Sequence, residues 1–450
     1  MIPLMGFCYM LQFMDKLALS QATQLGLLED LKLHGAQYSW CSSIFYFGYI
    51  AWSWPTSYLI VRFPAGKYLG VTVFCWGGIL MCHAACHSFA GLMATRFFLG
   101  VGEAAVAPGF ALITGMFYTR KEQPARQGAW WVGNAIANMI GGLVAYGVGK
   151  ITTSSLDHWK LLFLILGSVT AAYGVVLFLL LPDSPTKAIF LNEKESQIAL
   201  SRTIENKTGL LDDNKFVRQQ AIDALLDPQL WLLFLYTFTV NLANGGLTSF
   251  STIVIAGFGF SRLNSLLVQM PLGAAQLIFL ILTSGGASII PSSRSLFMLL
   301  NTITSVVGMA MVYALDDRAG RLAGLCLSAV FACNIPLSLS LVSSNVGGFT
   351  KRSVVSTTMF VAYCVGNIAG PQFFLAREKP RYKTGLIASL SGLCLGAFFI
   401  ACLLVYYIWE NRRRDRRFGP AQRSSSVVED LREDLAGKTD RQLTSFRYVI

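Results

Sequence analysis

The sequence predicts an all-α integral membrane protein. Only 13% of its 450 residues are charged, whereas 54% are hydrophobic, and the mean hydropathy is +0.53. A soluble domain has about 25% charged residues, so this chain has too few polar side chains to cover the outer faces of its apolar helices. Apolar runs of roughly 20 residues, long enough to cross the hydrocarbon core of a bilayer as a helix, recur along the chain. Together these observations predict twelve transmembrane helices.

Each predicted span is an apolar run with few or no charges. In order, the spans cover residues 1–21, 38–60, 68–87, 91–117, 128–149, 160–182, 229–250, 265–287, 295–315, 321–343, 353–375 and 385–409. The first span opens directly at Met1 without a basic segment, so a signal peptide is a poor interpretation. We expect instead a shortened start and a first span that is barely long enough.

One long charged connection separates the first six spans from the last six. We expect it to be cytoplasmic and to contain short amphipathic helices. The chain then divides into an N-terminal six-helix half, a central loop, a C-terminal six-helix half and a cytoplasmic tail, at residues 1–182, 183–228, 229–410 and 411–450. Two six-helix halves joined by a long loop are the arrangement of the major facilitator fold, whose halves rock about a site near the bilayer midplane.

Basic residues predict that both termini are cytoplasmic, because Lys and Arg are enriched in the cytoplasmic loops of membrane proteins. The asymmetry comes from the central loop and from the tail, which begins with the run "NRRRDRR". The net charge of +12 therefore reflects topology. Basic residues next to a span ordinarily face anionic lipid, so we expect no nucleic-acid partner.

The ten cysteines all fall in apolar spans, so they predict no disulfide framework. The stretch "CHAACH" places Cys82 and Cys86, and His83 and His87, one helical turn apart. Metals accept such ligands, but adjacent residues of a helix point about 100° apart. We interpret these residues as packing side chains and interfacial histidines and expect no metal. The chain also has no nucleotide-binding motif, so we expect no cofactor.

Four ionisable side chains lie well inside the predicted spans, namely Asp15, Lys16, Arg96 and Glu103. A charge at the bilayer centre costs roughly 2.5–3.5 kcal/mol on insertion scales, so each is expected to face a cavity or a partner. In the first span, Gln12 and Lys16 belong to one polar stripe at helical spacing, with Asp15 at its edge.

Arg96 and Glu103 lie seven residues apart in the fourth span. They therefore share one helix face, with a separation of about 10.5 Å along the axis. Gly100 and Ala107 lie on the same face and are expected to leave room for a ligand. A structural alternative is a salt-bridged lock between the first and fourth spans that has no contact with any ligand.

These four charges suit a small anion that crosses the membrane with a proton. The planar guanidinium of Arg96 fits a carboxylate, and Lys16 supplies a point charge on a flexible stem. Proton coupling needs a carboxylate that switches between ionised and neutral forms, a balance that burial and neighbouring cations set. We expect Glu103 to be the main proton carrier and Asp15 to be a coupling residue.

The second half offers only neutral polar groups within its spans. Such groups more often form hydrogen bonds between helices than bind a ligand. The substrate-binding candidates of the two halves together are Gln12, Lys16, Arg96 and Asn134 in the first half and Asn244, Tyr363 and Asn367 in the second.

Several stretches carry a family resemblance, among them "YSWCSSIFYFGYIAW", "RFFLGVGEAAVAPGFALITGMFYTRKEQPARQGAWW", "LLPDSPTKAIFL" and "AYCVGNIAGPQ". From about residue 2 to 415, the chain resembles fungal allantoate-permease-type transporters of the anion:cation symporter branch of the major facilitator superfamily. The resemblance implies twelve spans, residence in the plasma membrane and proton-coupled uptake of small organic anions such as allantoate, ureidosuccinate or nicotinate.

The resemblance also extends to the embedded charges. In related organic-anion symporters, an Asp–Arg pair in the first span and an Arg-x6-Glu pattern in the fourth bind the carboxylate and the proton. The matching positions here are Asp15, Lys16, Arg96 and Glu103, with Lys in place of Arg at position 16. Ser53 stands where the family pattern implies an acid.

The sequence therefore predicts a monomeric, proton-coupled symporter of a small organic anion that works by alternating access. An anion exchanger or facilitator of the same fold, or a transport-inactive nutrient sensor, remains an alternative interpretation. An enzyme is not expected, because the embedded groups include no nucleophile and base suited to catalysis.

Overall fold

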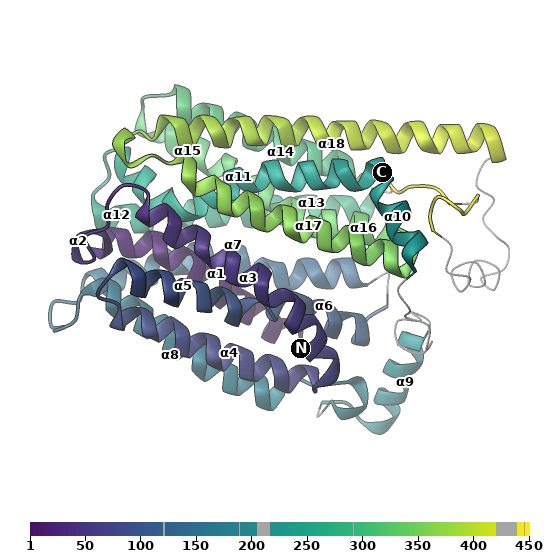
Figure 1. Cartoon of the computed structure of the whole chain (residues 1–450), viewed down its shortest axis with the longest axis horizontal. Coiled ribbons are helices and arrows are strands. Elements are labelled where there is room, and N and C mark those ends of the chain that lie inside the picture. Colours follow the sequence, from purple (N-terminus) through teal and green to yellow (C-terminus); the bar gives the residue numbers. More distant parts are fainter. Residues whose placement is uncertain (120–121, 189, 205–216, 291, 420–438, 445) are drawn as a thin grey trace.

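The computed structural model describes residues 1–119, 122–188, 190–204, 217–290, 292–419, 439–444 and 446–450. Within these residues the chain is helical and has no strand. The long helices run along the same axis and form an elongated bundle (Figure 1). We call the end of the bundle with α2 the α2 end, at the left of Figure 1, and the opposite end the tail end.

Six membrane-crossing segments form the N-terminal half. They are α1 (Ile2–Gln24), α3 (Gln37–Arg62), α4 (Ala65–Cys82), α5 (Phe89–Glu103) with α6 (Val106–Phe117), α7 (Gln123–Gly149) and α8 (His158–Leu180). The short α2 (Leu27–Asp30) joins α1 to α3. In this half α1 packs on α7 and α8, α3 packs on α5, and α4 packs on α8.

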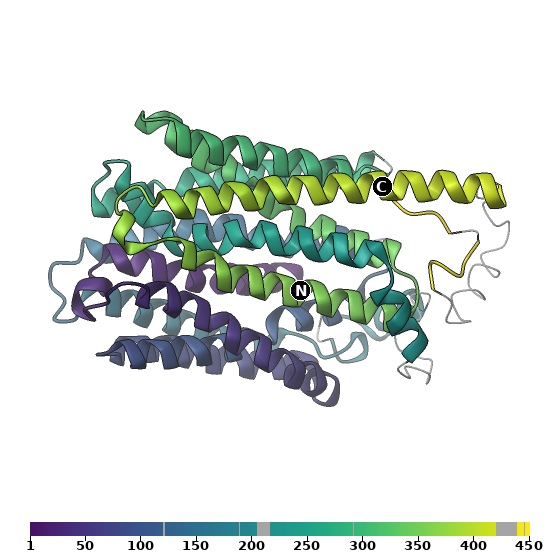
Figure 2. The ribbon, with the colours of Figure 1, turned by 45° about the horizontal axis from the view of Figure 1, so that its top comes forward.

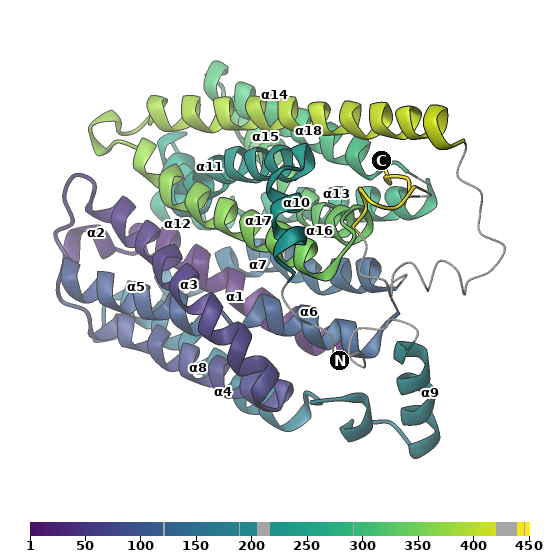
Figure 3. The same cartoon turned by 45° about the vertical axis from the view of Figure 1, so that its right-hand side comes forward.

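Six further segments form the C-terminal half. They are α11 (Pro228–Gly257), α12 (Arg262–Leu267) with α13 (Met270–Ile289), α14 (Arg294–Ala314), α15 (Arg318–Ser328) with α16 (Asn334–Asn345), α17 (Phe349–Ala369) and α18 (Lys383–Phe418). Here α11 packs on α17 and α18, and α14 packs on α15 and α18. Between the halves lie α9 (Glu193–Ile204), at the edge of the bundle, and α10 (Arg218–Leu225), which packs on α17 (Figure 3).

Among the described residues, ten segments are long and apolar enough by themselves to cross a membrane. The remaining two of the predicted twelve spans correspond to α1 and α3, which have 23 and 26 residues and are long enough to cross. Both carry polar side chains that lower their hydropathy. These side chains are buried within the protein, for example Gln12 and Ser20 on α1 and Ser42 on α3. The protein interior thus shelters these polar groups from lipid.

The C-terminal residues pack against the tail end of the C-terminal half rather than extending away from it. Asn345 donates to the Val449 carbonyl (2.8 Å) and accepts from the Val449 backbone N–H (2.7 Å). Asn411 forms the same pair of bonds with Tyr448, both at 2.8 Å. The sequence predicted the end of the last span near residue 409, but α18 continues to Phe418.

A buried ion cluster fastens this segment to the bundle. The Lys351 ammonium is fully buried and lies 2.7 Å from Asp227, 2.8 Å from Asp440 and 3.4 Å from Asp223. Burial raises the pKa of the Asp227 carboxyl, and the Lys351 ammonium opposes this rise. One lysine therefore joins α10, α11, α17 and the C-terminal segment.

Candidate functional site

Lys16 on α1 and Glu103 at the end of α5 form an ion pair inside the N-terminal half. The Lys16 Nζ lies 3.5 Å from the Glu103 Oε2, and the Glu103 side chain is fully buried. Gln12, one turn before Lys16, donates to the backbone carbonyl of Glu103 at 3.4 Å. Three of the predicted site residues therefore meet where α1 crosses α5.

Asp15 points away from the direction of the Lys16 side chain, because adjacent residues on a helix point about 100° apart. It is completely buried, and neither carboxylate oxygen has a hydrogen-bond partner among the described residues. Asp15 is therefore a buried acid without a described hydrogen bond, next to the Lys16–Glu103 pair but not part of it.

Arg96 lies two turns before Glu103 on α5 and is almost fully buried, with 3% of its surface exposed. Its Nε donates to the Cys41 carbonyl on α3 at 3.4 Å. Its Nη1 is buried without a hydrogen-bond partner. The guanidinium thus keeps a donor available at the site.

The ring of Phe45 on α3 contacts both cations. Its centroid lies 5.5 Å from Lys16 Nζ and 5.4 Å from the Arg96 guanidinium carbon. Lys16 also lies 5.6 Å from the Tyr49 ring. The negative face of an aromatic ring stabilises a cation, so these rings hold the two positive charges in the bundle without neutralising them.

The same face of α3 continues the site toward the C-terminal half. Tyr46 packs edge-on against Tyr363 of α17 at 5.9 Å, and Tyr49 packs on Phe360 at 5.4 Å. Tyr363, a predicted substrate-binding residue, thus contacts Tyr46 across the boundary between the halves.

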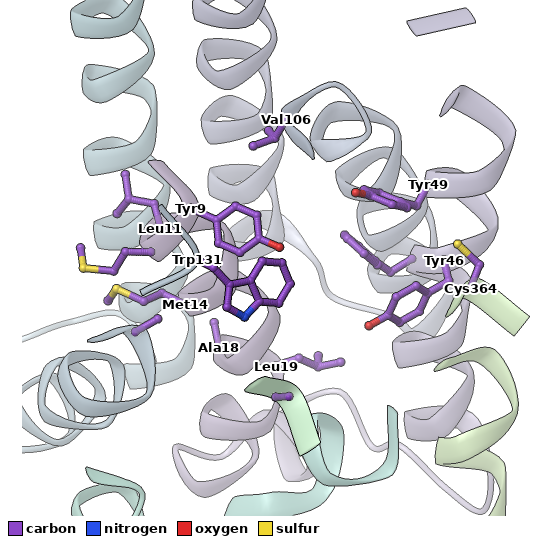
Figure 4. Close-up of a cluster of buried hydrophobic side chains, with 14 of the residues drawn as sticks. Tyr9, Leu11, Met14, Ala18, Leu19, Tyr46, Tyr49, Val106, Trp131 and Cys364 are labelled. Carbon is purple, nitrogen blue, oxygen red and sulfur yellow. The ribbon is translucent and has the colours of Figure 1, made fainter. Parts of the chain in front are cut away.

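On the α1 side, Tyr9 packs between two tryptophans of α7, at 4.9 Å from both Trp130 and Trp131. Figure 4 shows Tyr9 and Trp131 opposite Tyr46 and Tyr49, with the phenol oxygens of Tyr9 and Tyr49 directed toward the space between them. Aromatic side chains of α1 and α7 thus lie opposite those of α3.

The fourth span is interrupted directly after Glu103. The sequence predicted one continuous helix over residues 91–117, but α5 ends at Glu103 and α6 begins at Val106. Pro108 explains the break, because proline has no N–H to bond the carbonyl of Ala104 four residues earlier. Glu103 consequently lies at a helix end, where its carbonyl is open to Gln12.

Gly100 does not leave room for a ligand, and that prediction is wrong. A Cβ at Gly100 would lie 2.0 Å from the backbone oxygen of Phe45, and one at Gly48 would lie 2.1 Å from the oxygen of Phe97. The two glycines let the backbones of α3 and α5 touch. Their function is packing, and this packing brings Phe45 next to Arg96.

The amide residues lie in two separate groups. Asn134 on α7 is buried, and its side-chain oxygen has no hydrogen-bond partner. Asn367 on α17 donates to Asn241 (3.0 Å) and accepts from Asn244 (2.8 Å), both on α11. Asn244 and Asn367 therefore use their amides to join two helices of the C-terminal half.

A small cavity of about 50 Å³ lies between the halves. Phe13, Leu17 and Asn138 line it from the N-terminal half, and Asn244 and Gln276 are among its lining residues from the other half. Asn138 also donates to Gln276 at 3.0 Å. Asn138 was not among the predicted site residues, although it lies one turn after Asn134.

The halves are fastened toward the α2 end. Among the described residues, the side-chain hydrogen bonds and ion pairs between the two halves occur in the middle of the bundle and toward the α2 end. Besides the Asn138–Gln276 bond, they join Ser20 to Thr252, Gln21 to Gln269, Tyr38 and Ser42 to Ser249, Ser43 to Gln372 and to the Ile368 carbonyl, and Arg262 to Glu29. We call this set the α2-end clasp. The sequence did not reveal it, because small polar residues in spans have no distinctive spacing.

Within the described part of the chain, no three His, Cys, Asp or Glu side chains come together as a metal site. His83 of the "CHAACH" stretch is buried and stacks on Phe163 at 4.8 Å. It is a packing residue.

Comparison with known proteins gives a consistent identification. The family model of the Major Facilitator Superfamily matches residues 5–371. An uncharacterized transporter of Schizosaccharomyces pombe is 36% identical, over 100% of this chain and 84% of the relative. The allantoate permease of Saccharomyces cerevisiae is 33% identical, with the same coverage of both chains.

A solved structure shares the fold. A bacterial homologue of the human lysosomal transporter Spinster, in an inward-facing and occupied conformation, has a TM-score of 0.63 and 13% identity, over 91% of this chain and 96% of that chain. The sequence relatives are transporters and permeases, not enzymes. The chain therefore belongs to the major facilitator superfamily, within the allantoate-permease-like family of multi-pass membrane transporters.

Proposed function

We propose that this protein is a proton-coupled symporter of a small organic anion, working as a monomer in the plasma membrane with both termini in the cytoplasm. The observation that carries the proposal is the buried Lys16–Glu103 pair, 3.5 Å apart, beside the incompletely bonded Arg96. An embedded ionisable residue ordinarily marks a substrate or ion pathway. Here two cations and two acids lie in the interior of the N-terminal half, with Arg96 two helical turns from Glu103.

The anion is bound by exchange of partners. Arg96 offers its free Nη1 to a carboxylate, and Lys16 turns from Glu103 toward the same group. A charge-assisted hydrogen bond of this kind is about twice as strong as a neutral one. The aromatic residues around Lys16 exclude water, which strengthens the attraction between the ions.

Proton uptake is a consequence of this exchange of ion partners. When Lys16 leaves Glu103, an isolated carboxylate would remain in a buried site, and this is far more costly than a neutral carboxylic acid. Glu103 therefore takes up a proton as the anion binds. Asp15, buried without a partner, carries or relays the proton as a coupling residue.

Alternating access provides the transport cycle. With cytoplasmic termini, the α2-end clasp closes the outer side, so this arrangement faces inward. Opening requires the exposed Arg262–Glu29 ion pair, a weak interaction in water, and the neutral hydrogen bonds of the clasp to break. Each of these hydrogen bonds contributes only about 0.5–1.5 kcal/mol, which substrate binding can offset. Rocking of two halves about a central site is the general mechanism of this fold.

The substrate class is a small carboxylate such as allantoate, ureidosuccinate or nicotinate. The identity to the yeast allantoate permease supports it, as do two cations beside the Phe45 ring, with the Tyr49 ring also next to Lys16. The test is uptake of these three labelled anions into liposomes that contain the purified protein. A symporter accumulates one of them only with an inward proton gradient. Uptake that requires internal anion but no gradient would identify an exchanger, and binding without flux would identify a sensor.

A further inference from the structure

The last helix extends beyond the thickness of a membrane. α18 has 36 residues, and its stretch from 384 to 409 contains no charged residue. At 1.5 Å per residue this stretch spans about 39 Å, more than the hydrocarbon core of about 30 Å. Because the charged run begins at Glu410, we expect Trp409 to lie at the membrane boundary and the residues after it at headgroup level. Figure 2 shows α18 running past the other long helices at the tail end.

One face of this extension is occupied by the C-terminal segment. Arg414 bonds Glu410 and the carbonyl of Asp440, at 3.1 and 2.9 Å, and Asp415 pairs with Arg447 at 2.7 Å. These contacts fix the rotation of α18 about its axis. They also determine which residues the opposite side of the helix presents.

The helix surface outside these contacts presents four exposed arginines, Arg412, Arg413, Arg416 and Arg417, of which Arg413 and Arg417 also border the C-terminal segment. Arg413 pairs with Glu410 at 3.1 Å. Among the described residues, no acidic side chain pairs with the other three. Arg412 and Arg416 lie one helical turn apart, so their unneutralised charges point to the same region.

The four arginines line a groove of about 590 Å³ with Val405, Ile408 and Trp409. We call it the arginine groove. It has two parts in a fixed order, an apolar part at the level of the membrane and a cationic part just outside it. A free soluble anion would use only the cationic part. A phospholipid has an acyl region and a charged headgroup in this same order.

We propose that the arginine groove binds an anionic phospholipid of the cytoplasmic leaflet. The lipid phosphate and its headgroup anion lie against Arg412 and Arg416, and an acyl chain lies along Val405 and Trp409. The proposal depends on the cytoplasmic orientation of the termini but not on the transported substrate. Anionic lipids attract basic residues next to a span, and the apolar residues of the groove add a surface along which one acyl chain can pack.

The test measures lipid preference of the whole protein. Wild-type protein in mixed micelles is titrated with spin-labelled phosphatidylserine or phosphatidylcholine, and the motionally restricted fraction gives the relative affinity. We expect phosphatidylserine to be preferred, and R412Q/R416Q to reduce that preference roughly tenfold or more. K187Q/K194Q removes two exposed positive charges from the same end of the bundle and is the matched control, expected to leave the preference unchanged.

Three outcomes would overturn the proposal. The first is an unchanged preference in R412Q/R416Q, and the second is an equal loss in K187Q/K194Q, which would show a general charge effect. The third is complete displacement of the lipid by glycerophosphoserine, the headgroup without acyl chains, which would make the groove a site for soluble anions. The thermal unfolding midpoint of each variant confirms that it is folded. Uptake tests the proposed transport separately, so the two proposals can fail independently.

Discussion

The Lys16 ammonium lies 3.5 Å from the Glu103 carboxylate and joins α1 to α5 in the interior of the N-terminal half. Neither ion can lose its partner at that position without cost, because an unpaired buried charge is strongly unfavourable. An entering anion can replace Glu103 as the partner of Lys16, and a proton can replace Lys16 as the partner of Glu103. The ion pair is therefore the link we propose between the two transported species.

Replacing Lys16 by methionine removes the mobile cation but keeps a side chain of similar length. We expect uptake of the anion to fall at least about tenfold, since a hydrogen bond to a charged group contributes about 1.5–3 kcal/mol. Lys16→Arg should retain part of the activity, because a cation remains. Initial uptake rates in proteoliposomes measure this effect. Lys32→Met, at an exposed position of the α2 end, is the control and should transport normally.

Replacing Arg96 by alanine removes the guanidinium whose Nη1 lacks a partner. We expect the affinity for the anion to fall at least about tenfold, for the same energetic reason. The check is the ligand-induced rise in unfolding temperature, since a ligand that binds the folded state stabilises it. Arg62→Ala, which removes an exposed arginine bonded to Tyr58, should keep the full rise. An equal rise in Arg96→Ala would exclude Arg96 from the site.

Replacing Gly100 by alanine tests the contact between α3 and α5. The added Cβ would lie 2.0 Å from the Phe45 backbone oxygen, so the helices must separate. We expect destabilisation of about 1–3 kcal/mol, typical of an overpacked core, together with slower transport because Phe45 moves away from Arg96. Gly78→Ala on α4, whose added Cβ would meet nothing within 4 Å, is the matched control. Unfolding midpoints that fall equally in the two variants would contradict the account of Gly100.

Replacing Lys351 by methionine leaves Asp227 and Asp440 buried without their cation. Removing one partner from a buried ion pair costs about 3–5 kcal/mol, so a marked fall of the unfolding midpoint is expected. Arg441→Met removes a partly exposed partner of Asp223 and should cost less than about 1 kcal/mol. Similar midpoints for the two variants would show that the cluster does not hold the C-terminal segment.

The sequence predicted the helical spans and the embedded charges, because a charged residue within an apolar run can be recognised without knowing where the helix lies in the bundle. It could not predict which groups meet. Either Lys16 or Asp15 could have faced Glu103. The choice depends on how α1 is rotated and shifted along its axis relative to α5, and no local sequence pattern determines that rotation or shift. Pro108 was a usable signal for the break after Glu103. Lys351 and Asp440 are far apart in the chain, so only folding brings them together.

Glu103→Gln with simultaneous recording of anion uptake and proton influx tests the central claim most directly. In proteoliposomes that contain a pH-sensitive dye, the wild type should take up labelled anion and protons together under an inward proton gradient. Glu103→Gln keeps a neutral side chain of the same shape, so it should exchange internal for external anion but neither accumulate anion nor admit protons. Proton-driven accumulation at the wild-type level in Glu103→Gln would contradict the account.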